Sequence, residues 1–127
     1  AEAALRAGEL DEAGTEAKQA LAIARGLAMR GDEGISLRVL GEIASARDDL
    51  DQAPRLLVES LSMLREVGDE YQEGRSHLAL ATAYLRQGKV EQARTALDQC
   101  TSIFRRLDAF MDLSAASALH AEAAPVP

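Results

Sequence analysis

The side chains that could perform covalent chemistry are few and widely separated in this sequence. His77 and His120 are the only histidines, and Cys100 is the only cysteine. Nucleophilic catalysis needs a serine or cysteine beside a histidine base that a carboxylate orients, and the sequence marks no such group. We expect both histidines to lie half-buried on packing faces and the thiol to be buried and inert; the alternative for Cys100 is a reactive or redox site. No enzymatic activity is expected.

Two short patterns resemble ion-binding loops but lack essential residues. Asp48, Asp49 and Asp51 form an acidic cluster without the glycine and the distant glutamate of a calcium loop, and we interpret it as the start of a helix. The glycines Gly26, Gly31 and Gly34 are not followed by the Lys-Ser/Thr pair of a phosphate loop, so we interpret this stretch as a helix–helix linker. No metal and no cofactor are expected.

The elements that must position any functional side chain follow from a phrase that occurs three times, forty residues apart. The phrase begins at Gly8, Asp48 and Gly88 and ends at Ala13, Ala53 and Ala93. The match continues with Ala20, Ser60 and Cys100, then with Ala24, Leu64 and Phe104, and on the N-terminal side with Gly34 and Gly74. A fixed period of this size indicates small units that stack, which favours function on an extended surface rather than in a pocket.

Each unit is predicted to contain two helices. The first helices are expected over roughly 33–46 and 70–86, and the second helices over roughly 50–66 and 90–106, from apolar residues at helical spacing. Gly8, Asp48 and Gly88 are expected to mark the turns inside the units, and Gly31-Asp32 and Gly68-Asp69 the linkers between them. The 25 alanines of the chain suit closely packed helices, of which we expect about seven.

This pattern resembles the tetratricopeptide repeat family, whose helix-turn-helix units stack into a right-handed superhelix. The residues that carry the resemblance are Leu80-Ala81-x-x-Tyr84, Gly88, Ala93 and Cys100, and in the preceding unit Leu40-Gly41, Asp48, Ala53 and Ser60. The chain departs from the family pattern at Leu37 and His77, where tryptophan is common, and at Arg65 and Arg105, where proline is common. The resemblance implies an all-α solenoid of antiparallel helix pairs that serves as a non-catalytic protein-interaction module.

The 40-residue unit is longer than the usual 34 residues of the family. It is similar to the repeats of large bacterial signal-transduction ATPases and LuxR- or MalT-like transcriptional activators, which implies a regulatory context. We expect a single array over residues 1–124, with a partial unit at 1–30, full units at about 31–67 and 68–107, the first helix of a further unit at 109–123, and a tail or linker at 125–127. Because Ala1 falls within an expected helix, we expect the chain to be part of a larger protein. A single cysteine requires no oxidising compartment, so we expect a cytoplasmic location.

The resemblance also implies a binding surface, because the first helices of the family line a concave groove that receives a peptide or a partner helix. The residues placed there by register are Arg38, Glu42, Arg75, Leu78, Thr82 and Arg86, with Ile35 and Ser45 beside them. Their spacings of three and four residues put them on one helix face. Three arginines on this face favour a partner with an acidic segment. The alternative is that Arg38 and Glu42 form an ordinary surface pair and the other arginines are only solvated.

Other partners and functions find different degrees of support in the sequence. The lysine and asparagine carboxylate clamp of some chaperone-binding members is absent, so that activity is not inferred. A formal net charge of −7 disfavours nucleic acid and anionic membrane surfaces as partners. Two alternative functions stay open: self-association through ends that lack polar caps, and the sensing of a small effector that switches an attached domain. The apolar residues near those ends are Ala3, Ala4 and Leu5 on one side and Phe110, Met111 and Leu113 on the other.

The recurrent alanine at the start of each second helix gives a first test of the register. Leucine at Ala93 should hold the two helices of its unit apart, so we expect Ala93→Leu to lower the free energy of unfolding by about 1–3 kcal/mol through overpacking. Thermal unfolding that is unchanged in this variant would contradict the register.

Overall fold

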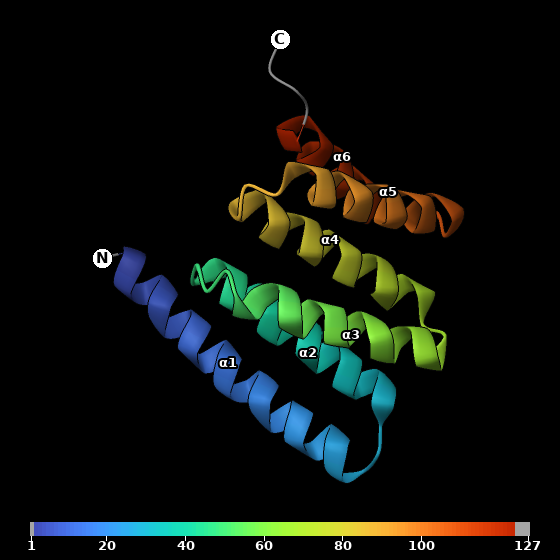
Figure 1. Cartoon of the computed structure of the whole chain (residues 1–127). Helices are drawn as coiled ribbons and strands as arrows, with labels where there is room; N and C mark the ends of the chain where they lie inside the picture. Colours follow the sequence, from blue (N-terminus) through green and yellow to red (C-terminus); the bar gives the residue numbers. More distant parts are fainter. Residues whose placement is uncertain (1, 124–127) are drawn as a thin grey trace.

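The chain forms six α-helices that stack as antiparallel neighbours, with the first and last helices at opposite ends of the stack (Figure 1). The structure, a computed structural model, describes residues 2–123, with side chains from residue 6 onward. The helices are α1 (Glu2–Gly26), α2 (Arg30–Ala46), α3 (Gln52–Val67), α4 (Glu70–Arg86), α5 (Val90–Arg106) and α6 (Phe110–Ala123). Residues 2–123 contain no strand, and the expected all-α solenoid is confirmed. The tail expected at 125–127 lies outside the described residues.

All five loops end the preceding helix in the same way. Each contains one residue with a left-handed backbone, and these residues recur every twenty positions: Ala28, Asp48, Gly68, Gly88 and Asp108. The amide of the following residue returns to a carbonyl five positions earlier, as from Asp69 to Leu64 (3.0 Å) and from Lys89 to Tyr84 (2.8 Å). This is the bond that closes a Schellman-type helix end. The 40-residue period therefore divides into two halves that share one turn geometry.

Two sequence-based expectations about turns were wrong. Gly8 does not mark a turn, because α1 continues through it, and the array has six helices over residues 2–123 rather than about seven. No other element lies within 4 Å of the Cβ position at Gly8, so no tertiary contact imposes a left-handed turn there. Gly31 lies inside α2 rather than in a linker, since the Met29 carbonyl already accepts a helical bond from the Glu33 amide (3.0 Å).

Within each complete unit the two helices approach closely at glycine. A Cβ atom at Gly34 would lie 2.8 Å from Leu64 Cγ, and one at Gly74 would lie 2.7 Å from Phe104 Cε1. Similarly, a Cβ atom at Gly41 would lie 2.6 Å from Leu57 Cγ. The three large side chains are fully buried in these contacts. Glycine therefore sets the distance between the helices of a unit, because any other residue would displace the side chain that seals the pair.

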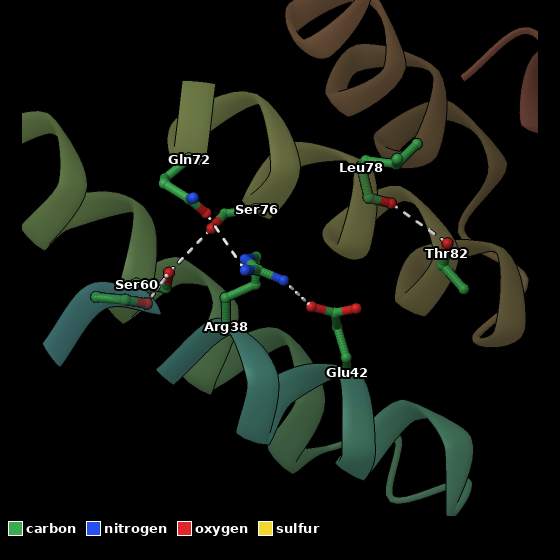
Figure 2. Close-up of polar contacts among 8 residues, drawn as sticks. Arg38, Glu42, Ser60, Gln72, Ser76, Leu78 and Thr82 are labelled. Carbon is green, nitrogen blue, oxygen red and sulfur yellow. Dashed lines mark hydrogen bonds and ion pairs between the residues drawn. The ribbon is translucent and has the colours of Figure 1, made fainter. Parts of the chain in front are cut away.

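A buried polar contact joins three successive helices at the junction of the two complete units. The Ser60 hydroxyl on α3 donates to the Gly34 carbonyl on α2 at 2.6 Å and lies 2.9 Å from the Ser76 hydroxyl on α4 (Figure 2). Both serines are fully buried. Because each hydroxyl has a partner, neither carries the penalty of an unsatisfied buried group, and the contact fixes the relative positions of the three helices.

The surface ion pairs repeat with the same period. Arg30 pairs with Glu66 at 2.6 Å, and forty residues later Glu70 pairs with Arg106 at 2.7 Å, so the charges are exchanged. Exposed pairs of this kind contribute little to stability. The two pairs show, however, that the first residue of the first helix lies beside the end of the second helix in both complete units.

The close approach at Gly74 and the continuous α1 can be tested with a matched pair of substitutions. Gly74→Ala should lower the free energy of unfolding by about 1–3 kcal/mol, because the added methyl meets the buried Phe104 ring. Gly8→Ala should raise it by about 0.5–1 kcal/mol, because alanine in an open helical position favours the helix. Both are measured by chemical denaturation. Destabilisation by Gly8→Ala would instead indicate the turn that the sequence suggested.

Candidate functional site

The first helices of the units line two adjoining hollows on one face of the stack. The larger, of about 440 Å³, lies among α2, α4 and α6, and the smaller, of about 390 Å³, among α1, α2 and α4. Glu42 and Arg75 line both hollows, and we call the two together the groove. The larger hollow is lined by Glu42, Ser45, Ala46, Arg75, Leu78, Ala79, Thr82, Arg86, Ala115, Ala118 and Leu119. The smaller is lined by Leu10, Ala13, Arg38, Val39, Glu42, Ile43 and Arg75.

All six residues that the sequence placed on the binding surface line the groove, although their role in binding remains a prediction. Arg38 is less accessible than expected, with 6% of its surface exposed. It lies on α2, and its guanidinium donates to Glu42 on the same helix and to Gln72 Oε1 on α4, at 3.3 Å in the second case (Figure 2). Arg38 is therefore buried and joins two units through Gln72, whereas its partner Glu42 on the same helix is exposed.

Arg86 is also engaged within the fold. From the end of α4 it donates to the Ser45 carbonyl at 2.8 Å and pairs with Asp48 at 3.0 Å. Ser45 belongs to the last turn of α2, where carbonyl groups carry a partial negative charge and a cation is favourable. Arg86 thus ties the ends of two first helices together at the rim of the groove.

Arg75 differs from these two arginines. Among the described residues it has no carboxylate within ion-pair distance and no hydrogen-bonded side-chain partner, although it is half-buried. The Thr82 hydroxyl is occupied, because it donates to the Leu78 carbonyl at 3.3 Å (Figure 2). Ser45 lines the groove, but its hydroxyl oxygen is buried and has no hydrogen-bond partner within the part of the chain that the structure describes. Among the described residues, the groove therefore offers one unpaired cation, Arg75.

Several lining residues were missed by the sequence reasoning. Alanines form much of the apolar wall, together with Leu119 from α6. The repeat itself carried the signal for them, since Ala115 and Ala118 lie forty residues after Arg75 and Leu78, and Leu119 lies forty residues after Ala79. The wall therefore consists mostly of small side chains.

Cys100 and His77, the two buried side chains that could take part in catalysis, lie outside the groove. Cys100 is fully buried, as expected, and burial raises the pKa of its thiol to about 11, which keeps it protonated and unreactive. His77 is buried on α4, with its Nε2 3.5 Å from Arg65 Nη2. Burial and then the Arg65 charge lower the pKa of His77 to about 4. Both observations agree with a packing role for these side chains.

The acidic cluster after α2 behaves as a helix start. Asp49 Oδ1 accepts a bond from the Gln52 amide at 3.3 Å, and Asp48 carries the left-handed backbone of the loop. Among residues 6–123, whose side chains the structure describes, no group of three or more His, Cys, Asp and Glu side chains is placed to hold a metal ion. In the same range no helix is both long and apolar enough to cross a membrane.

Comparison with known protein families identifies the repeat. A family model described as tetratricopeptide repeat matches residues 32–106, which is more than half of the chain. No curated protein sequence matched the chain. Repeats of this family generally mediate protein–protein interaction and act as non-catalytic scaffolds.

His77 predicts a pH dependence of stability whose sign follows from its lowered pKa. Between pH 6.5 and 4 the unfolded chain binds a proton that the folded chain does not, so the free energy of unfolding should fall as the pH falls. Leucine occupies the equivalent position at Leu37, so His77→Leu is a substitution that the repeat already accommodates. It should remove about 1–2 kcal/mol of the loss measured by urea denaturation between about pH 7.5 and pH 5. An equal loss in both proteins would contradict the assignment.

Proposed function

This chain belongs to the tetratricopeptide repeat family, and we propose that it is a protein-interaction module that binds a peptide or partner helix with an acidic segment in its groove. The proposal rests on a difference among the three arginines of the groove: two of them have an anionic partner within the chain and the third has none among the described residues. Arg38 is neutralised by Glu42, and Arg86 by Asp48 and a helix end, whereas Arg75 has no anionic partner among the described residues. A carboxylate of the ligand would supply the anionic partner that Arg75 lacks.

The position of Arg75 makes it an effective anchor. It lines both hollows and lies at their junction, so an extended or helical ligand that follows the groove must pass it. Its half-buried surroundings strengthen an ion pair relative to one in open solvent, and its planar guanidinium can bind a carboxylate with two parallel hydrogen bonds.

The apolar wall supplies the remainder of the recognition. Alanines from α2, α4 and α6 line the larger hollow together with Leu78 and Leu119. Small apolar ligand side chains at helical spacing would fit this wall while an acidic residue reaches Arg75. The ligand class is therefore an amphipathic segment with alanine- or leucine-sized apolar residues and at least one carboxylate.

We further propose that this module belongs to a larger regulatory protein. The 40-residue period, longer than the family's usual unit, is what supports a likeness to the arrays of large bacterial regulatory proteins. In such a protein the module would be cytoplasmic and would connect a bound partner to an attached regulatory domain.

A selection from a random peptide library tests the site without knowledge of the partner. Peptides of about 16 random residues, long enough for roughly four helical turns, are displayed on phage and selected against the whole chain. Their binding is then measured by fluorescence anisotropy. We expect the selected peptides to contain Asp or Glu, and Arg75→Glu to weaken their binding at least about tenfold, because it replaces an ion pair by a repulsion.

Arg55→Glu is the matched control, since Arg55 is exposed on α3 and outside the groove lining, and the change in net charge is the same. The control should bind the selected peptides with unchanged affinity. Equal weakening by both variants would show a nonspecific charge effect, and undiminished binding by Arg75→Glu would refute this site.

A further inference from the structure

Glu42 is the one carboxylate among the described residues that line the groove, and it borders the same two hollows as Arg75. Glu42 lies on α2 and Arg75 on α4, so a negative and a positive charge lie on neighbouring first helices. No ion pair joins these two side chains within the part of the chain that the structure describes, since Glu42 pairs with Arg38 instead. A ligand that follows the groove therefore meets both charges.

The ion pair with Arg38 leaves part of the Glu42 carboxylate free for a ligand. Only its Oε1 atom accepts a hydrogen bond from Arg38, and Figure 2 shows the second oxygen directed away from that residue. The Glu42 side chain is 45% exposed, whereas the Arg38 side chain is 7% exposed. The pair is neutral as a whole, but a ligand reaches the carboxylate before the guanidinium. A ligand cation beside Glu42 would therefore lie closer to the negative charge than to the buried positive one, which is favourable.

The same carboxylate acts against a ligand that carries only acids. A ligand carboxylate paired with Arg75 lies in hollows that Glu42 also borders, so the two like charges repel each other. A base next to the ligand's acid removes this repulsion and adds an attraction. Glu42 would thus reject some ligands and favour others, which is how charged residues commonly determine specificity.

From these charges we propose that the ligand carries a lysine or arginine beside its acidic residue, and that Glu42 binds this base while Arg75 binds the acid. This inference rests on the proposed function and narrows its ligand class to an amphipathic segment with both charges next to its apolar face. Because Glu42 and Arg75 border the same hollows, the base should lie within about two helical turns, or about seven residues, of the acid.

A double-mutant cycle between the chain and a peptide from the library tests this pairing. Each lysine or arginine of the peptide is replaced in turn by methionine, and the peptides are titrated by fluorescence anisotropy against the whole chain and against Glu42→Gln. Glutamine keeps an oxygen acceptor for Arg38 and removes the charge. Glu42→Gln and one of the methionine replacements should each weaken binding about twofold to fivefold, the usual range for an exposed ion pair. Both together should weaken it no more than either alone, because they remove the same interaction.

Glu59→Gln is the matched control. Glu59 is an exposed glutamate on α3, outside the groove lining, and it too has an arginine partner, Arg25 at 3.5 Å. Its side chain is 48% exposed, close to the value for Glu42, and the change in net charge is the same. The control should bind the peptides with unchanged affinity. Circular dichroism checks that both variants keep their helix content.

Stronger or unchanged binding by Glu42→Gln would overturn the inference, because a ligand with only an acid at this point gains when the repulsion is removed. Selected peptides without lysine or arginine would overturn it too, as would methionine replacements that all leave the affinity unchanged, and this last result needs no change to the protein. Arg75→Glu separates these outcomes from failure of the proposed function. If it still weakens binding, the peptide occupies the groove and only the role of Glu42 fails; if it does not, the groove itself is not the site.

Discussion

The close approach of the two helices within each unit is the constraint on which the rest of this structure depends. At Gly34, Gly41 and Gly74 the absence of a side chain lets a leucine or phenylalanine of the second helix lie directly on the backbone of the first. This proximity brings the Ser60 hydroxyl within reach of both the Gly34 carbonyl and Ser76, so that one unit is fixed on the next. It also keeps the first helices on one face, which creates the groove.

Once the first helices are aligned, the charges along them become distinguishable. Arg38 and Arg86 look alike in the sequence, but each is engaged by neighbouring elements that the solenoid brings together. Arg75 on α4 occupies the repeat position that holds Ile35 on α2 and Ala115 on α6. The equivalent residues in the neighbouring units are apolar. No carboxylate of the described residues therefore pairs with the Arg75 guanidinium.

The fold was largely predictable from the sequence because the period is strict and the second helices of the two complete units, α3 and α5, are strongly amphipathic. The ranges expected for α4 and α5 agree with the structure, since each begins and ends beside a left-handed residue that recurs in register. The errors came from glycines interpreted as turn markers. Gly8 and Gly31 are helical, whereas Ala28 and Asp108, which are not glycines, have the left-handed backbone. The position of each turn is therefore set by the hydrogen bond that closes the helix end and not by residue type alone.

The candidate site was predictable in its positions but not in its charges. Spacing placed Arg38, Arg75 and Arg86 on one face, yet the acceptors that engage two of them come from Gln72, Ser45 and Asp48, which only the packed structure brings close. The contribution of α6 to the wall could have been found by extending the period by one more unit.

The most direct test of the groove is to map where a selected peptide contacts the chain in solution. Amide chemical shifts of the isotope-labelled protein are followed by nuclear magnetic resonance while an acidic peptide from the library is added. The largest changes should occur at Arg75, Leu78 and Ala118, on the walls of the groove. Changes confined to Asp98, Ser102 and Arg105 on the surface of α5 would contradict the account, because those residues line a different depression, outside the groove.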